Sequence, residues 1–398
     1  MSWFVLVESN TTGSGRVFCE RARELGLRPV VLARDPARYP YVAADGIAAR
    51  QVDTGDPAVV LAACRRLGGR VAGVTSSSEY HIATAAEVAR RLGLPHPDPG
   101  AIRACRDKAV QRAVLREAGV PSAAFAPART PGTAVAAAQR IGFPVVVKPV
   151  AGSGSVATRL CRDAAEVEAA THHVLNTDGL PPQSAVMVEE YLRGAEYSVE
   201  TFDDQVVGVT RKHLGAEPYF VEVGHDFPAP LDPAARAAAG ELAHAALKAL
   251  ELCWGPAHVE IRYGAAGARI VEVNPRLAGG MIPRMVEEAT GIDLIRHTVA
   301  KAAGRDEPLR PTRDRAASIR FLVAGEEGTL TAIDGTKDAG RVPGVVEVGL
   351  TRTPGQYLVL RRSFQDRLCY VIAAADTGAA AARAATTGLH ALKARITT

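Results

Sequence analysis

The expected fold follows from two short stretches, His258-Val259-Glu260-Ile261-Arg262 and Ile270-Val271-Glu272-Val273-Asn274-Pro275-Arg276. Each stretch alternates apolar and polar residues, which is the pattern of a strand with one buried face. Ala265-Ala266-Gly267 lies between them and predicts a three-residue hairpin loop, with Gly267 in the left-handed conformation. Centring the hairpin on Ala266 places Glu260 opposite Glu272.

The paired acids indicate a cation site. Two carboxylates that face each other on a sheet repel unless a cation lies between them. Residues i and i+2 of a strand share a face, so Asn274 adds its amide oxygen beside Glu272. Oxygen donors without sulfur or imidazole suit Mg²⁺ rather than zinc, and Arg276 follows where a phosphate would lie. The alternative is a solvent-exposed acidic face of an edge hairpin.

Two other segments indicate phosphate and nucleotide contacts. Lys148 ends the apolar strand Phe143-Pro144-Val145-Val146-Val147-Lys148-Pro149, directly before the small-residue loop Ala151-Gly152-Ser153-Gly154-Ser155. A lysine with backbone N–H groups and serine hydroxyls suits a triphosphate. The run Glu189-Glu190-Tyr191-Leu192, followed by Glu196, could bind an adenine edge and ribose hydroxyls, or be surface acids that flank a turn.

Together these motifs resemble the ATP-grasp superfamily of carboxylate–amine ligases. The resemblance covers about 101–310 and extends more loosely to both ends; its motifs are Asp107-Lys108, 143–149 with its loop, E-E-Y-L-R-G-A-E (189–196) and E-V-N-P-R-L-A-G-G (272–280). It implies that Lys108 and Lys148 contact the ATP phosphates beneath a mobile lid of Gly152, Ser153, Gly154 and Ser155. It implies that Glu189, Glu190, Tyr191 and Leu192 line the adenine cleft and that Glu196 binds the ribose. It also implies two Mg²⁺ ions, with Mn²⁺ as a substitute, on Glu260, Glu272 and Asn274, and Arg276 steadying the transferred phosphoryl group or the tetrahedral intermediate.

Within that superfamily the chain is most similar to the bacterial L-amino acid ligases. The supporting segments are S-S-S-E-Y (76–80), L-G-L-P (92–95), R-D-K (106–108) and F-V-E-V-G-H-D-F-P (220–228). This resemblance implies that Glu222 and His225 contact substrate and that one of them is the base; solvated loop residues are the alternative. It implies ATP-dependent amide formation through an acyl-phosphate, with release of ADP and phosphate. A carboxylase that uses carboxyphosphate and a non-catalytic ATP-binding regulatory protein are the alternative functions.

The order of predicted elements defines three parts and a fold class of α/β and α+β. Residues 1–100 predict a Rossmann-like domain, because apolar runs at 3–7, 29–32 and 71–75 alternate with helical patterns at 17–25, 57–67 and 79–92. Residues 101–310 predict the ATP-grasp domain, with a small lid subdomain at about 115–188 and a larger metal-bearing subdomain at about 189–310. A helix is expected at 101–118 and an irregular segment at 213–230. Residues 311–398 predict a separate C-terminal α+β module.

Composition excludes several classes of function. The 398 residues include 47 Lys and Arg against 43 Asp and Glu, a balance too even to favour nucleic acid, and 5% aromatics do not favour a base-stacking surface. No secretion signal or membrane span is apparent, and the six cysteines are scattered singly, so we expect a cytoplasmic protein with reduced thiols. The expected partners are a small carboxylate or amino-acid substrate and an amine, with neither nucleic acid nor membrane; a homodimer is left open.

Overall fold

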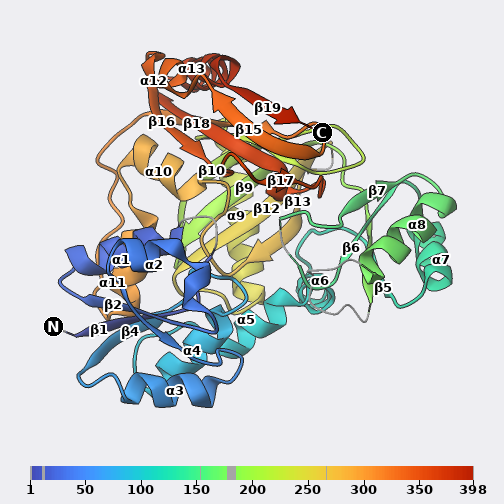
Figure 1. The fold of residues 1–398 in the computed structure, drawn as a ribbon. Helices are drawn as coiled ribbons and strands as arrows, with labels where there is room; N and C mark the ends of the chain where they lie inside the picture. The colour runs from blue at the N-terminus through green and yellow to red at the C-terminus, as the bar shows by residue number, and fades with distance from the viewer. Residues whose placement is uncertain (1, 11–13, 153, 177–184, 266, 398) are drawn as a thin grey trace.

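The N-terminal part is an α/β layer built on a four-stranded parallel sheet (Figure 1). The computed structural model describes residues 2–10, 14–152, 154–176, 185–265 and 267–397. The sheet order is β3-β2-β1-β4, from Trp3–Val7 (β1), Arg28–Ala33 (β2), Ala48–Gln51 (β3) and Val71–Thr75 (β4). Its helices are Ser14–Glu24 (α1), Pro40–Ala44 (α2), Pro57–Arg65 (α3) and Ile82–Arg91 (α4). The parallel sheet is confirmed; β3 was not expected, because this short strand is half-buried to exposed and has no apolar run.

Glu8, directly after β1, is a buried carboxylate that ties this part together. It accepts hydrogen bonds from the Tyr39 hydroxyl at 2.6 Å, the Thr54 hydroxyl at 2.7 Å and the Arg34 backbone N–H at 2.8 Å. Burial by itself would raise the pKa of Glu8, but these hydrogen bonds outweigh it and lower the pKa below its ordinary value.

We expect Glu8→Gln to lower the free energy of unfolding by about 1–3 kcal/mol, because a buried carboxylate with three donors becomes an amide with a mismatched N–H₂ group. A carboxyl with a lowered pKa stabilises the fold above its unfolded pKa, and that contribution is lost as the pH falls through the folded pKa. The difference in unfolding free energy between wild type and Glu8→Gln should therefore be largest at neutral pH and should become smaller in acid. Urea unfolding at both pH values measures it.

The matched control is Glu20→Gln on α1, where a half-exposed carboxylate pairs with Arg16 at 3.4 Å. That change should stay within about 0.5 kcal/mol. Equal effects of the two substitutions at every pH would contradict the assignment to Glu8.

Two helices replace the single helix expected at 101–118, so that prediction was wrong. They are Pro99–Arg106 (α5) and Lys108–Glu117 (α6). The chain breaks at Asp107, which is extended and whose side chain accepts hydrogen bonds from the N–H groups of Ala109 and Val110. Because Asp107 is the N-cap, Lys108 begins the new helix at the edge of the central cleft.

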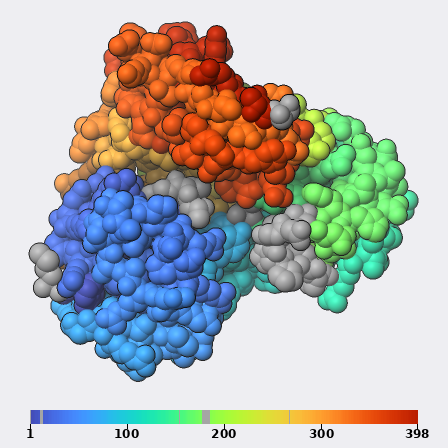
Figure 2. Space-filling view, in the orientation of Figure 1, coloured from blue at the N-terminus to red at the C-terminus, as the bar shows by residue number. Residues whose placement is uncertain are grey.

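The segment expected to be the small lid subdomain forms a four-stranded antiparallel sheet covered by two helices, which projects to the right in Figure 1; we call this part the lid. The sheet order is β5-β8-β6-β7, from Phe125–Ala128 (β5), Val145–Pro149 (β6), Arg159–Cys161 (β7) and Val186–Glu190 (β8). Pro131–Ile141 (α7) and Ala164–Leu175 (α8) begin at capping residues Thr130 and Asp163 and pack their small apolar faces on this sheet. The space-filling view shows an indentation between this subdomain and the N-terminal part (Figure 2).

An eight-stranded antiparallel sheet forms the centre of the molecule. Its order is β13-β12-β9-β10-β11-β14-β18-β16, from Ala195–Phe202 (β9), Gln205–Leu214 (β10), Glu222–Phe227 (β11), Pro256–Gly264 (β12), Gly267–Asn274 (β13), Ala316–Val323 (β14), Val345–Leu350 (β16) and Arg367–Ala375 (β18). Pro233–Ala249 (α9) packs on one face, and Ile282–Thr290 (α10) packs on the other. Leu294–Ala302 (α11) joins the N-terminal part by packing against α1.

Two expectations about this sheet were wrong. The segment 213–230, expected to be irregular, contains β11, which pairs with both β10 and β14. The C-terminal module is not separate, because β14, β18 and β16 continue the central sheet through backbone pairing. Its other elements are Gly328–Asp334 (β15), Tyr357–Leu358 (β17), Lys393–Thr397 (β19), Thr336–Arg341 (α12) and Gly378–Ala391 (α13), with β17-β15-β19 as a small sheet. No helix in the described ranges has the length and apolar character needed to span a bilayer.

Candidate active site

The acidic hairpin places its two carboxylates opposite each other, as expected. Glu260 of β12 pairs with Glu272 of β13, and His258 pairs with Asn274. The expected uniform register was wrong, because Gly264 pairs with Gly267 and the register shifts between Glu260 and Ile261. This irregularity restores the Glu260–Glu272 pairing. Gly267 has a φ of 89°, and Ala266 lies outside the described residues.

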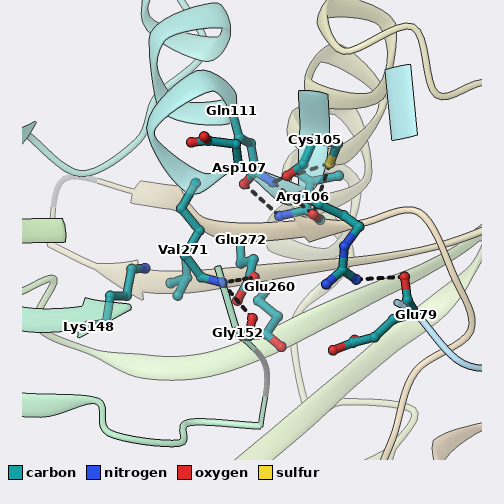
Figure 3. A network of polar contacts seen from close by, with 12 residues as sticks. Glu79, Cys105, Arg106, Asp107, Gln111, Lys148, Gly152, Glu260, Val271 and Glu272 are labelled. Carbon is teal, nitrogen blue, oxygen red and sulfur yellow. Dashed lines mark hydrogen bonds and ion pairs between the residues drawn. The ribbon is translucent and has the colours of Figure 1, made fainter. Parts of the chain in front are cut away.

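Each of these carboxylates is neutralised by a lysine. Lys108 Nζ lies 2.9 Å from Glu272 Oε1, and Lys212 Nζ lies 3.2 Å from Glu260 Oε1. The side chains of Glu260 and Glu272 lie between Lys148 on one side and Glu79 on the other (Figure 3). The hairpin is therefore a site where cations meet two facing carboxylates, not a solvated acidic edge.

The donor chemistry fits a hard divalent cation. Two carboxylates and the buried Asn274 amide are oxygen donors of the kind Mg²⁺ prefers. In the described part of the chain, no three His, Cys, Asp or Glu side chains gather in a group that could hold a metal ion. Behind Glu260, His258 lies 3.1 Å from its Oε1 and 3.0 Å from Glu200 Oε2. Burial opposes a charged imidazole, but these two carboxylates outweigh it and raise the pKa of His258 to about 9.

The lid contributes the second lysine and the small-residue loop. Lys148, at the end of β6, is buried, with its Nζ 2.6 Å from Glu189 Oε2. Burial lowers the pKa of Lys148 despite this carboxylate. Lys108 Nζ donates to the Gly152 carbonyl at 2.8 Å, so the loop after β6 reaches the hairpin. Gly154 and Ser155 both have positive φ, at 64° and 60°, and Ser153 lies outside the described residues.

The last two residues of β8, Glu189 and Glu190, turn their side chains to different partners. Glu189 is buried between Lys148 and Arg112, whose Nε donates to Glu189 Oε1 at 2.9 Å. Glu190 turns to Arg269, with 2.7 Å between Arg269 Nη1 and Glu190 Oε1. Both acids are therefore already paired. Burial alone would raise the pKa of Glu189, but the positive charges and hydrogen bonds of Arg112 and Lys148 outweigh it and lower the pKa below its ordinary value.

Tyr191, Leu192 and Glu196 are joined by one arginine that the sequence did not single out as a site residue. Arg262 Nη1 donates to the Leu192 carbonyl at 2.9 Å, and its Nη2 lies 3.0 Å from Glu196 Oε2. The same guanidinium lies over the rings of Tyr191, at 5.2 Å, and Phe220, at 5.4 Å. These contacts make a flat, partly aromatic wall with a carboxylate at its end.

These groups surround one cavity between the lid and the central sheet, which is open to solvent and has an empty volume of about 840 Å³. Its lining includes Lys108, Lys148, Gly152, Gly154, Ser155, Glu189, Glu190, Tyr191, Leu192, Glu196, Glu222, Glu260 and Glu272. A neighbouring cavity of about 340 Å³ shares Lys108, Gly152 and Glu272 and adds Asn274 and Arg276. The structure therefore brings together nearly all the residues that sequence reasoning selected from four separate segments.

Glu222 and His225 differ in their access to these cavities. Glu222 lines the larger one, whereas His225 is fully buried and lines neither. His225 Nε2 lies 3.5 Å from Glu222 Oε2, and neither ring nitrogen has a hydrogen-bond partner in the described ranges. Burial lowers the pKa of His225 to about 3, so the imidazole is neutral, and Lys212 and Arg367 hold the pKa of Glu222 well below its ordinary value despite its burial.

Sequence reasoning missed the charged residues that hold the selected ones in place. Lys212 lies 3.1 Å from Glu196, 2.6 Å from Glu222 and 3.2 Å from Glu260. Arg276 Nε lies 2.6 Å from Glu79 Oε2, on the S-S-S-E-Y segment. A sequence signal for Lys212 is its place in the alternating segment that forms β10. No local pattern marks Arg112 or Arg367, because their partners lie 77 and 145 residues away.

Comparison with known proteins agrees with this geometry. A family model described as ATP-grasp domain matches residues 141–284, and one described as L-amino acid ligase C-terminal domain 2 matches 320–397. Uncharacterized protein y4rH of Sinorhizobium fredii is 40% identical over 380 residues, which are 95% of this chain and 79% of that protein. Carnosine synthase 1 of Gallus gallus is 29% identical over 363 residues, covering 81% of this chain but only 38% of that longer protein.

A solved structure shows the same fold over the whole chain. The crystal structure of L-amino acid ligase from Bacillus licheniformis superposes with a TM-score of 0.84 at 21% sequence identity, covering 100% of this chain and 99% of that one. At this identity the likeness establishes the fold, and the sequence relatives and family models establish the membership. The chain belongs to the ATP-grasp ligases and carries the C-terminal domain of the L-amino acid ligases.

Proposed function

We propose that this ligase joins the carboxylate of an amino acid to an amine through an acyl-phosphate, converting ATP to ADP and phosphate. The observation that carries the proposal is the facing pair Glu260 and Glu272 in one cavity with Lys108 and Lys148, beside the cavity that holds Arg276. Such a site offers acids for a metal and cations for phosphates within the reach of one bound nucleotide.

The nucleotide would lie along the larger cavity. Its adenine would meet the wall of Tyr191, Phe220 and Leu192, and its ribose hydroxyls would meet Glu196. Its phosphates would meet Lys148 and Lys108, covered by the loop that contains Gly152. On binding, the lysines would exchange Glu189 and Glu272 for phosphate oxygens, which keeps both charges paired throughout.

Glu260, Glu272 and Asn274 would hold Mg²⁺, as two ions with Mn²⁺ as a substitute. When bound there, the metal offsets negative charge on the phosphates. A metal bound there would replace Lys108 as the partner of Glu272 and Lys212 as the partner of Glu260.

The chemistry needs no nucleophilic side chain. A carboxylate oxygen of the acid substrate attacks the γ-phosphorus, the bond to the β–γ bridging oxygen breaks, and ADP leaves. The amine then attacks the acyl carbon, phosphate departs, and the amide remains. Arg276, fixed by Glu79, lies beside the acids and would steady the phosphoryl group or the tetrahedral intermediate.

The amine must lose a proton before or during its attack. Glu222 is ionised and reaches the cavity, so it would bind the substrate ammonium, and neutral His225 lies 3.5 Å behind it. Only Glu222 reaches the cavity, so it would take the ammonium proton directly, and a proton would pass to His225 only through Glu222.

The test measures ADP and inorganic phosphate over pairs of amino acids with Mg²⁺ and ATP. We expect ADP formation that requires both an acid and an amine, and a product whose mass is their sum less one water. AMP and pyrophosphate would contradict the acyl-phosphate. Bicarbonate-dependent ADP release that needs no amino acid would identify a carboxylase instead, and tight ATP binding with no turnover for any pair would identify a binding protein.

A further inference from the structure

The C-terminal part of the chain contributes one side chain to the surroundings of Glu222. Arg367, the first residue of β18, is 7% exposed. Its Nε and Nη2 donate to the Glu222 carbonyl at 3.1 and 3.0 Å, and Nη2 also lies 2.8 Å from Glu222 Oε2. Its guanidinium lies 3.9 Å from the centroid of the Phe321 ring. One guanidinium therefore holds both the backbone and the carboxylate of Glu222.

The second oxygen of that carboxylate is held from the opposite side. Lys212 Nζ lies 2.6 Å from Glu222 Oε1, whereas Arg367 takes Oε2. Two cations on different oxygens fix the plane of the carboxylate as well as its position. Glu222 also begins β11 where the register with β10 is irregular, so backbone pairing alone does not set its place.

The loop after Arg276 packs directly on this group. A Cβ at Gly280 would lie 2.6 Å from His225 Nε2 and 3.6 Å from Arg367 Nη1. The backbone of Gly280 therefore lies close against these two side chains. As a result, His225 and Arg367 have little room to move toward Gly280. Arg367 itself lines neither cavity, so it reaches a substrate only through Glu222.

We infer that Arg367 is a positioning residue that orients Glu222 toward the amine substrate, which makes the C-terminal domain part of the amine subsite. The inference rests on the proposed function. A lysine at this position would keep the charge but lose the fork that holds a carbonyl and a carboxylate together.

The test compares wild type, Arg367→Lys and Arg367→Met with the amino-acid pair that reacts fastest in the ADP screen. We expect kcat/KM for the amine to fall about 10–100-fold in Arg367→Met, because a displaced contact group costs this much, and less in Arg367→Lys. The KM values for ATP and for the acid should stay within about twofold of wild type. Arg361→Met, an exposed arginine six residues earlier, is the matched control and should be unchanged.

Hydroxylamine separates positioning from general damage. It is a small nucleophile that is uncharged at neutral pH, so it needs no ammonium contact; its nitrogen attacks the acyl-phosphate carbon, phosphate leaves, and a hydroxamate forms. We expect hydroxamate formation from the acid and ATP to continue at the wild-type rate in both Arg367 variants.

Three results would overturn the inference. A wild-type kcat/KM for the amine in both variants would show that Arg367 does not act through Glu222. Equal losses in amine ligation, hydroxamate formation and ATP affinity would show a structural role, and if Arg367→Met fails to fold, Arg367→Lys decides by the same comparison. A wild-type protein that forms no ADP with any pair would instead remove the proposed function, and the inference with it.

Discussion

Glu272→Gln is expected to reduce amide-forming ADP release by about 10³-fold or more. The substitution keeps the volume and one oxygen but removes one of the two charges that face each other across β12 and β13. A metal held by those charges supplies several kcal/mol in the transition state, and each 1.36 kcal/mol is worth about tenfold in rate. ADP release at saturating ATP, Mg²⁺ and substrates measures the loss.

Binding and folding controls make this result specific. Mn²⁺ binding in the presence of a non-hydrolysable ATP analogue should weaken in the variant, while its thermal unfolding midpoint should stay near that of wild type. Glu241→Gln on the exposed side of α9 makes the same chemical change far from the cavity and should leave ADP release unchanged. Wild-type turnover by Glu272→Gln would remove this residue from the metal site.

Lys212→Met is expected to affect both stability and turnover. The side chain of Lys212 is 2% exposed and is the cation shared by Glu196, Glu222 and Glu260. Burial opposes its charge, but the three carboxylates outweigh that cost and raise the pKa of Lys212 well above its ordinary value. Removing one partner of a buried ionic cluster costs about 3–5 kcal/mol, because the charges that remain are left unpaired.

Urea unfolding measures the stability loss, and the ADP assay measures the turnover. We expect ADP release to fall below detection, because the residues proposed to bind the ribose, the amine and the metal all lose the same cation. Lys248→Met, on the exposed face of α9, is the control and should change the unfolding free energy by less than about 0.5 kcal/mol. Unchanged stability of Lys212→Met would mean that the three carboxylates do not depend on this lysine.

Helices and strands with a strong local sequence pattern were predicted well. Elements that form only because an adjacent strand or a capping side chain imposes them were not. The apolar runs of β1, β2 and β4 identified the parallel sheet. β11 was missed because its residues, Glu222–Phe227, alternate too weakly to indicate a strand until β10 and β14 lie beside them. The single helix at 101–118 failed because the capping preference of Asp107 outweighs the helical pattern that runs through it.

The pairing of Glu260 with Glu272 shows how a correct prediction can have an incomplete reason. Symmetry about Ala266 gave the pair, yet the observed turn is shorter and a register shift between Glu260 and Ile261 restores the alignment. Counting residues outward from the turn cannot locate such an irregularity, because a bulge changes the register without any mark in the spacing.

Local chemistry therefore specified the acids, lysines and small-residue loops of the site, since motif order and strand alternation are properties of neighbouring residues. Tertiary packing specified their partners: Arg112 for Glu189, Arg367 for Glu222, and Lys212 for three carboxylates at once. It also joined the C-terminal strands to the central sheet. A buried charge is stable only beside an opposite charge. Because the fold brings these partners together from distant parts of the chain, no local sequence pattern predicts which residues pair.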